Sequence, residues 1–266
     1  MDLLPAMPRP TVTYPGIVVA DPPGFRPLQL DLHIPAGEGP FPVVFWVHGG
    51  GWTSGSRVWL PDSIEPFGFH QRLIDRGYAV ADVDYRLARE ISFPAQLDDV
   101  QAAIRWVRTH AAQLRLDPAR FATLGESAGG QLAALAGLLG SDDTAVHAVV
   151  DWYGVSDFLA LKGRDDPEDN VARYLGGPLP AVTETARAAS PTHRVHAGAP
   201  PFLAVHGTDD RVVPFAQSVE LAEALRAVGV RCDVLAAEGG DHCFVGYADI
   251  GGLIDAGIDF LDDVLG

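Results

Sequence analysis

Basic residues are scarce in this sequence of 266 residues. There are 19 Lys and Arg against 35 Asp and Glu, which leaves a formal net charge of −16 at pH 7. Nucleic acids and anionic membrane surfaces are bound through a basic footprint that displaces counterions. The composition therefore opposes both kinds of partner, and it disfavours polyanionic substrates as well.

Cysteine is nearly absent, and long apolar runs are absent altogether. Cys232 and Cys243 are too few for a disulfide framework, and a strand over 231–237 would hold them too far apart to bridge. No apolar run approaches the ~20 residues that a membrane span needs, and the first residues lack the basic and apolar segments of a signal peptide. The sequence predicts a cytoplasmic protein with reduced cysteines and no membrane partner.

What the sequence does contain is a regular alternation of apolar runs and helix-forming segments, which is typical of an α/β domain with a mostly parallel sheet. The apolar runs are continuous, as expected for strands that are covered by helices on both faces. They lie at 42–47, 78–83, 120–125, 147–154, 201–207 and 231–237. The expected helices lie at 66–77, 94–114, 128–140 and 215–229.

Two further segments complete the predicted organisation. Residues 11–20 and 26–35 form two candidate antiparallel strands, and the prolines in and beside them suit the edge of a sheet. Residues 161–200 lie between two strands and are too many for a simple crossover, so we expect a small helical insertion that acts as a lid. We predict a single domain over 1–266.

One short motif stands out, Gly-Glu-Ser-Ala-Gly at 125–129, between the predicted strand 120–125 and the helix that follows it. A nucleophile elbow needs this arrangement, because the tight turn strains the backbone at the serine and leaves no room for side chains at the flanking glycines. The turn would project the hydroxyl of Ser127 from the carboxyl edge of the sheet, where ligands bind in open α/β folds. The alternative is a glycine-rich turn that contains a serine by chance.

A serine hydroxyl needs a base to take its proton and a third group to orient that base. In hydrolases with a nucleophile elbow, the chain order is serine, acid, histidine. After the last long strand and helix only His242 remains, in a glycine-rich loop beyond 231–237. The acid is expected on the loop after the preceding strand, where Asp209 and Asp210 both qualify on spacing.

Ester or amide cleavage also needs donors aimed at the oxyanion of the tetrahedral intermediate. The backbone amide of Ala128, directly after the nucleophile, is one candidate. The loop after the strand 42–47 supplies three consecutive glycines, and Gly50 and Gly51 can turn their amides toward a substrate because they carry no side chains. These features occur in the right order at the right strand ends, which favours a catalytic interpretation of Ser127.

Four segments together resemble the α/β-hydrolase esterases of the hormone-sensitive-lipase-like and related bacterial carboxylesterase group. They read HGGGW at 48–52, GESAGG at 125–130, HGTDDRVVP at 206–214 and GGDHCF at 239–244, and the likeness extends over nearly the whole chain. The resemblance implies an α/β-hydrolase fold with about eight strands, helices on both faces and no cofactor or metal. It also implies a catalytic triad of Ser127, Asp210 and His242, an oxyanion hole of Gly50, Gly51 and Ala128, and a structural role for His48.

The sequence departs from this group in two places. Larger members carry a helical cap ahead of the glycine-rich segment, whereas only 47 residues precede His48 here, so we expect the insertion 161–200 to roof the pocket. Position 243 holds a cysteine where a glycine often follows the histidine. That change would alter the wall of the pocket but not the chemistry.

Other residues near the motifs have structural alternatives. Trp52 and Glu126 are predicted to contact the substrate, although ordinary core packing is about as good an explanation for Trp52. A hydrogen-bonded structural cluster, rather than a substrate clamp, is expected for Tyr85 and Arg86 with Asp98 or Asp99. His193 and His196 lack the companion ligands of a metal site, and the acidic run 164–169 lacks the loop spacing of a calcium site.

These inferences predict a serine carboxylesterase that acts on small or short-acyl esters. The expected partner is a small-molecule ester, and a homodimer is left open. An arylformamidase shares the same motifs, and the fold cannot separate the two. A peptidase of the prolyl-oligopeptidase type usually needs a further domain, and a non-catalytic binding protein of this fold tends to lose a triad residue.

Overall fold

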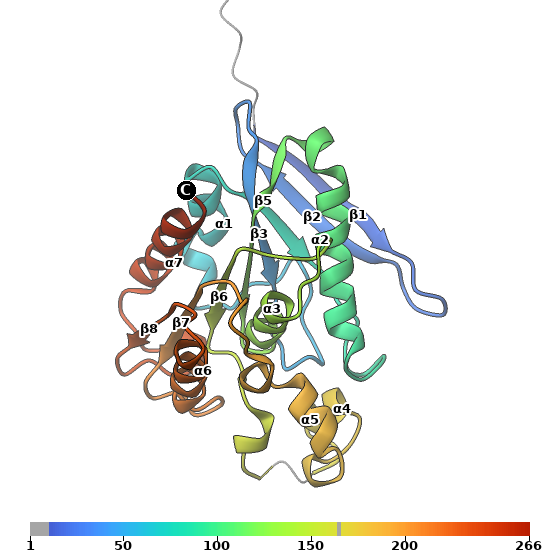
Figure 1. Ribbon diagram of the computed structural model, residues 1–266, viewed down its shortest axis with the longest axis vertical. Helices are drawn as coiled ribbons and strands as arrows, with labels where there is room; N and C mark the ends of the chain where they lie inside the picture. The colour runs from blue at the N-terminus through green and yellow to red at the C-terminus, as the bar shows by residue number, and fades with distance from the viewer. Residues whose placement is uncertain (1–10, 164–165) are drawn as a thin grey trace, which may run out of the picture.

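The computed structural model describes residues 11–163 and 166–266. Eight strands form one twisted sheet at its centre (Figure 1). Its strand order is β1-β2-β4-β3-β5-β6-β7-β8. The strands are β1 (Val12–Ala20), β2 (Leu28–Ile34), β3 (Phe41–Val47), β4 (Ala79–Val83), β5 (Leu116–Glu126), β6 (Ala148–Trp152), β7 (Phe202–Gly207) and β8 (Cys232–Ala237). β2 is antiparallel to both β1 and β4, and all other pairs are parallel. The predicted α/β fold with a mostly parallel sheet is confirmed.

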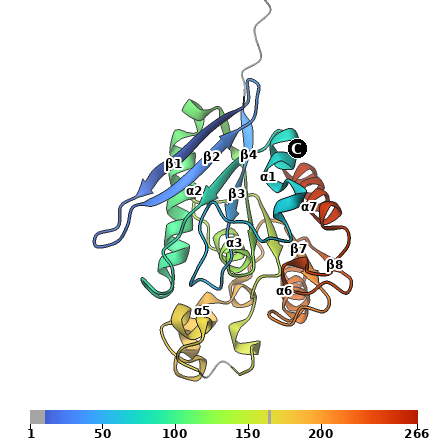
Figure 2. The ribbon, with the colours of Figure 1, turned by 180° about the vertical axis from the view of Figure 1, so that it is seen from behind.

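Helices cover both faces of this sheet (Figures 1 and 2). On one face pack α2 (Ala95–Leu114), α3 (Ala128–Leu138) and α6 (Ala216–Ala227), and on the other α1 (Phe69–Asp75) and α7 (Ile250–Leu265). In β3, Phe45 contributes to the first core and Trp46 to the second, because successive side chains of a strand point to opposite faces. Both are fully buried, which explains why the strand sequences are continuously apolar.

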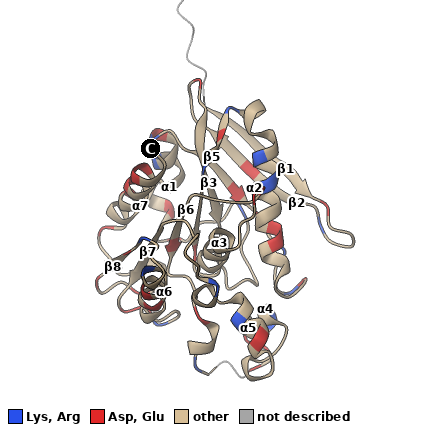
Figure 3. Ribbon diagram, in the orientation of Figure 1, with Lys and Arg blue, Asp and Glu red and all other residues tan. Residues whose placement is uncertain are grey.

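Helix α7 is an element that our sequence analysis did not assign. Its buried residues Ile254, Ile258, Leu261 and Leu265 recur at helical spacing, so the signal was present. Its outer face is acidic, as Figure 3 shows, and it is paired with α1: Arg72 binds Asp255, and Arg76 binds Asp262. In the predicted helix 66–77, Gly68 adopts a φ of 66° and separates a 3-10 turn, η1 (Glu65–Phe67), from α1. No helix of the described chain is long and apolar enough to cross a membrane.

The segment between β6 and β7 is helical, as predicted. It contains α4 (Asn170–Leu175) and α5 (Thr183–Ala189), together with the 3-10 turns η2 (Phe158–Ala160), η3 (Leu179–Ala181) and η4 (Pro191–Arg194). Figure 1 shows α4 and α5 beyond the carboxyl ends of the strands. The acidic run 164–169 lies partly outside the described residues. The lid function of this segment and the single-domain organisation stay predictions.

A buried carboxylate joins the antiparallel edge of the sheet to α1. Asp82 on β4 accepts hydrogen bonds from Nε2 of His33 on β2, at 3.1 Å, and from Nε2 of His70 on α1, at 2.6 Å. Burial raises the pKa of Asp82, but these two hydrogen bonds outweigh it and lower the pKa below its ordinary value. The bond to Asp82 in turn raises the pKa of His33. The hydrogen bonds between Asp82 and the histidines are therefore charge-assisted at mildly acidic pH.

We expect Asp82→Asn to lower the free energy of unfolding by about 3 kcal/mol at pH 6, because it removes one partner of a buried charged cluster. The contribution of Asp82 is lost as the pH falls through its lowered pKa. The contribution of His33 is complete below its ordinary pKa of about 6.5 and is lost as the pH rises through its raised pKa. Urea unfolding of both proteins at pH 6 and pH 9 measures this, with the exposed Asp98→Asn as control. An equal deficit at both pH values would contradict the assignment.

Candidate active site

Four loops meet at the carboxyl edge of the sheet. The strand register places Val47 at the end of β3 beside Gly125 near the end of β5, and Gly207 of β7 beside Ala237 of β8. The loops that follow these strands carry the glycine-rich segment 48–52, Ser127, Asp210 and His242. The parallel register therefore gathers groups that are up to 194 positions apart in the chain, from His48 to His242.

Ser127 occupies a strained turn between β5 and α3. Its φ is 53° and its ψ is −117°, a conformation that side-chain-bearing residues rarely adopt. A Cβ added at Gly125 would lie 2.2 Å from the backbone oxygen of Gly129, and one added at Gly129 would lie 2.0 Å from the oxygen of Val47. Both positions therefore exclude any side chain, as the elbow motif requires.

The side chains of Ser127, His242 and Asp210 form a hydrogen-bonded row. Oγ of Ser127 lies 3.0 Å from Nε2 of His242, and Nδ1 of His242 lies 2.7 Å from Oδ2 of Asp210. His242 begins the 3-10 turn η5 (His242–Phe244), and its side chain is 16% exposed. The neighbouring candidate Asp209 is exposed, so Asp210 is the aspartate that contacts the imidazole.

Asp210 is held as an anion although its side chain is fully buried. Burial raises its pKa, but hydrogen bonds with His206 and His242 and the positive charge of His242 more than offset this, so its pKa lies well below the ordinary range. Its Oδ1 accepts the backbone amides of Val212 and Val213, each at 2.8 Å. An anion fixed in this way can orient the imidazole and stabilise its protonated form.

The glycine-rich loop lies beside the elbow and is supported from below. Gly50 and Gly51 have φ values of 95° and 59°, in the left-handed region that favours glycine. The ring of His48 stacks on Tyr85 at 4.3 Å, and Oη of Tyr85 donates to the oxygens of His48 and Gly49. Burial lowers the pKa of His48 to about 4, so the ring is neutral and serves as packing, in agreement with its predicted structural role.

Arg86 extends this support. Its guanidinium and backbone amide bind the carboxylate of Asp99 on α2, with Nη2 at 2.7 Å from Oδ1 and the amide at 2.8 Å from Oδ2. Of the predicted cluster, the pairing of Arg86 is confirmed, with Asp99 rather than Asp98 as the partner, whereas the hydroxyl of Tyr85 bonds to the backbone of His48 and Gly49. Ala128 is the first residue of α3, where the first backbone amides have no partner within the helix.

Trp52 does not line an open pocket, which corrects our expectation that it binds substrate. It is 3% exposed, and its ring stacks on Tyr174 of α4 with 4.4 Å between centroids. Its Nε1 donates to Gln131 of α3 at 3.0 Å. Next to it, Asn170 of α4 contacts Gly51, since a Cβ on Gly51 would lie 2.6 Å from Nδ2 of Asn170. Trp52 therefore fixes the helical insertion onto the glycine-rich loop.

Glu126 is also inaccessible to a substrate, which corrects the second substrate-binding expectation. Only 1% of the residue is exposed. Its carboxylate points under the glycine-rich loop, where a Cβ on Gly49 would lie 1.9 Å from Oε1. Burial raises the pKa of Glu126 to about 7, and this is opposed by the positive charge of His242 and by the nearby Gly49 amide and Tyr153 hydroxyl.

Backbone strain is concentrated at this edge of the sheet. Among the described residues, six non-glycine positions have a positive φ, and five of them follow β3, β5, β6 or β8. These five are Trp52, Ser127, Tyr153, Cys243 and Phe244. Strained residues of this kind cluster at functional sites, where the surrounding packing holds them in place. The φ of 57° at Cys243 also explains why a glycine suits this position.

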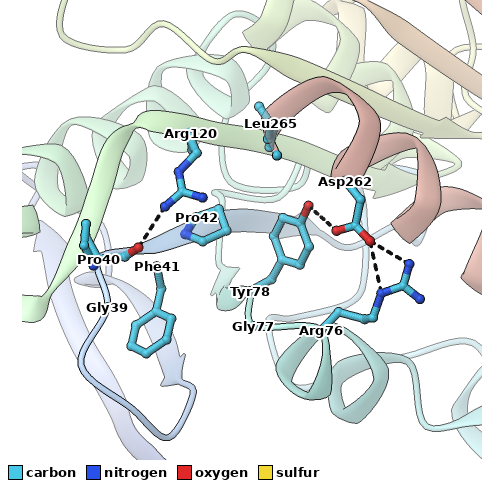
Figure 4. Close-up of a pocket in the computed structure, with 11 residues that line it drawn as sticks. Gly39, Pro40, Phe41, Pro42, Arg76, Gly77, Tyr78, Arg120, Asp262 and Leu265 are labelled. Atoms are coloured by element: carbon cyan, nitrogen blue, oxygen red, sulfur yellow. Dashed lines mark hydrogen bonds and ion pairs between the residues drawn. The ribbon is translucent and has the colours of Figure 1, made fainter.

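Two hollows adjoin the catalytic loops. One of about 420 Å³ is lined by Gly50, Ser54, Gly55, Ser56 and Trp59, and the other, of about 510 Å³, includes Leu161, Arg211 and Val212. A further hollow of about 330 Å³ lies at the opposite end of the strands, beside the first residues of β3 and β4. Figure 4 shows Arg76 and Tyr78 directed at Asp262 there, so its polar groups satisfy one another far from Ser127.

Comparison with known proteins identifies the family of the chain. The family model described as BD-FAE matches residues 30–225. The chain belongs to the BD-FAE family. The matched part of this BD-FAE chain includes Ser127 and Asp210 and ends before His242.

Individual relatives of this BD-FAE protein are esterases by name. It is 37% identical over 206 residues to Esterase LipC of Mycobacterium tuberculosis, a match that covers 71% of this chain and 49% of LipC. The chain spans about half the length of the curated relatives it matches first.

Solved structures give the same picture over nearly the whole chain. A bifunctional GH43-CE protein of Bacteroides eggerthii has a TM-score of 0.85 at 28% identity, covering 96% of this chain and 35% of that one. The butyrate-bound esterase Est2 of Thermogutta terrifontis has a TM-score of 0.76 at 27% identity, covering 96% and 94%. The predicted α/β-hydrolase fold and the predicted kinship with carboxylesterases are confirmed.

We expect Gly129→Ala to destabilise the protein by at least about 3 kcal/mol, because the added methyl group would overlap the oxygen of Val47 and force α3 away from β3. Thermal unfolding measures this loss. The matched control is Gly257→Ala in α7, where an added Cβ meets its nearest atom at 3.8 Å. Alanine should be neutral or stabilising there by up to about 1 kcal/mol, since it favours helix. Equal stability of both variants would show that the elbow is not sterically constrained.

Proposed function

We propose that this protein is a serine carboxylesterase that hydrolyses small or short-acyl esters through an acyl-enzyme intermediate, without a cofactor. The observation that carries the proposal is the hydrogen-bonded row of Ser127, His242 and Asp210, which starts from a strained elbow at the carboxyl edge of the sheet. The kinship with named esterases supports it.

In the first half of the reaction, Oγ of Ser127 attacks the ester carbonyl carbon while Nε2 of His242 takes the hydroxyl proton. Asp210 stabilises the resulting imidazolium through Nδ1. The carbonyl oxygen becomes an oxyanion, which the amides of Gly50, Gly51 and Ala128 can stabilise. Collapse of this intermediate breaks the ester C–O bond, and the imidazolium gives its proton to the departing alcohol.

The second half repeats these roles with water as the nucleophile. His242 takes a proton from water as the water oxygen attacks the acyl carbon, and the same amides stabilise the second oxyanion. Its collapse breaks the bond to Oγ of Ser127, which recovers the proton from His242 as the carboxylic acid leaves. The low pKa of Asp210 keeps it ionised through both halves, so the orientation of the imidazole is maintained.

Exposed apolar side chains on the catalytic loops suit an ester with a small apolar part. Val212 and Val245, 52% and 55% exposed, lie within three residues of Asp210 and His242. Val58 and Trp59 are 73% and 38% exposed, and their loop also reaches the histidine, because Oγ of Ser63 donates to the oxygen of Cys243 at 2.5 Å. We propose that the insertion 161–200 covers these exposed side chains and the catalytic loops as a lid.

The alternatives gain no support from the comparisons. The curated relatives that the chain matches first are named as esterases or carboxylic ester hydrolases, and none of those names refers to a formamide substrate. The three side chains that a non-catalytic relative would tend to lose are present and hydrogen-bonded. The cytoplasmic location and the homodimer stay predictions.

We expect Ser127→Ala to lower kcat toward p-nitrophenyl acetate by at least about a thousandfold and to leave the fold intact, because only the nucleophile is lost. The wild type should show a maximum of kcat/KM at two to four acyl carbons when esters from acetate to dodecanoate are compared. Circular dichroism checks the fold. Near-normal turnover by Ser127→Ala would sink the assignment of the nucleophile.

We expect Trp59→Ala to raise KM for p-nitrophenyl esters roughly three- to tenfold with little change in kcat, because it removes an exposed apolar surface beside the glycine-rich loop without touching the triad. Steady-state kinetics with p-nitrophenyl butyrate measure the effect. Tyr14→Ala on β1 removes a similarly exposed ring, 43% against 38%, far from the site, and serves as control. The same KM in both variants would place the substrate elsewhere.

A further inference from the structure

A buried acid beneath the active site has no part in the mechanism described above. Glu126 is the last residue of β5 and directly precedes Ser127, but its side chain is buried against Gly49 of the glycine-rich loop. Within the described residues its Oε1 makes no well-formed hydrogen bond, and the nearby Gly49 amide and Tyr153 hydroxyl offset its burial only in part. A carboxyl group buried with so little compensation is costly, so its presence calls for an explanation.

The carboxylate supports the loop that carries the proposed oxyanion donors. A Cβ on Gly49 would lie 1.9 Å from Oε1 of Glu126 and 2.7 Å from Oε2, so the loop backbone rests directly on this group. The Gly49 amide favours the charged form of Glu126. Gly50 and Gly51 follow immediately, so a change at Glu126 would be transmitted to their amides within one or two residues.

Four ionisable groups from other elements face Glu126. They are Tyr85 after β4, Tyr153 after β6, and His242 and Cys243 of η5. Burial and the charge of Glu126 raise the pKa of both tyrosines far above neutrality, and they raise the pKa of Cys243 to about 12. These three side chains are uncharged at neutral pH. His242, whose Nε2 lies 3.0 Å from Oγ of the adjacent Ser127, favours ionised Glu126 when its imidazole is protonated.

We infer that Glu126 is a positioning residue whose buried negative charge stabilises the imidazolium that His242 forms during catalysis and supports the loop at Gly49. This inference rests on the proposed ester hydrolysis. The charge attracts His242 only after the imidazole has taken the serine proton, so the interaction is stronger in the transition state than in the ground state. Such an interaction raises kcat and leaves KM largely unchanged.

The protonation of Glu126 gives the inference a distinctive signature. Burial raises the pKa of Glu126 to about 7, so the group is neutral in mildly acidic solution and charged in mildly alkaline solution. A neutral Glu126 supplies the same packing as glutamine but no charge. The advantage of the wild type over Glu126→Gln should therefore exist only above the pKa of Glu126, whereas a packing role would be independent of pH.

The experiment compares kcat of the wild type and of Glu126→Gln with p-nitrophenyl acetate from pH 5.5 to pH 9. We expect the ratio of wild-type kcat to Glu126→Gln kcat to be near one at the acid end and to rise to roughly tenfold at the alkaline end, with a midpoint near pH 7. A tenfold effect corresponds to about one pKa unit of charge interaction. Glu126→Asp keeps the charge, so its kcat at the alkaline end should lie between that of the wild type and that of Glu126→Gln. Glu223→Gln makes the same change at an exposed position of α6 and should have no effect.

A second variant keeps the inference testable if Glu126→Gln does not fold. The Tyr153 hydroxyl lowers the pKa of Glu126, so Tyr153→Phe should move the midpoint of the kcat profile to higher pH. A ratio independent of pH, or an unmoved midpoint in Tyr153→Phe, would overturn the role of Glu126 while leaving the esterase proposal intact. Failure of the esterase proposal has a different result, namely wild-type activity that is absent or that Ser127→Ala retains.

Discussion

The close contact between the start of α3 and the ends of β3 and β5 is the constraint on which the site depends. There is no room for a side chain at Gly129, which packs against the oxygen of Val47. There is none at Gly125 either, which packs against the backbone of Gly129. Because helix and strands meet at backbone distance, the chain must turn within one residue, and Ser127 takes the strained conformation that this requires. The same contact brings the loop after β3 alongside the serine, so nucleophile and glycine-rich loop share one steric cause.

Packing from all sides maintains the strained edge. Two buried cores, one on each face of the sheet, fix the strand ends from which the loops depart. The stacked rings of His48 and Tyr85 support the glycine-rich loop from below, and the stacked rings of Trp52 and Tyr174 connect it to the insertion. Strain at isolated residues persists only where neighbouring structure over-determines their conformation, and these aromatic contacts provide that structure here.

Buried acids make the second physical theme of the molecule, and their surroundings decide what each can do. Asp210 meets two histidines and two backbone amides, so its pKa falls although it is buried. Glu126 meets weaker compensation, and its pKa rises to about 7. Asp82 resembles Asp210 in having two histidine partners, but it joins β2 and β4 to α1. Three buried carboxylates thus have different charge behaviour because their hydrogen-bond partners differ.

The sequence by itself determined the fold class, the strand ends and the segments that carry Ser127, His242 and the glycine-rich loop, because apolar periodicity and glycine spacing are local properties of the chain. It also contained the periodic signal of α7 in the spacing of its buried residues. Spacing along the chain left Asp209 and Asp210 equivalent, although the family resemblance pointed to Asp210, and the sequence suggested that Trp52 and Glu126 face the substrate. Only the tertiary structure brought Asp210 into contact with His242, left Asp209 exposed and buried the other two residues. Adjacent side chains point in different directions, and which of them meets His242, Tyr174 or Gly49 depends on elements that are distant in sequence.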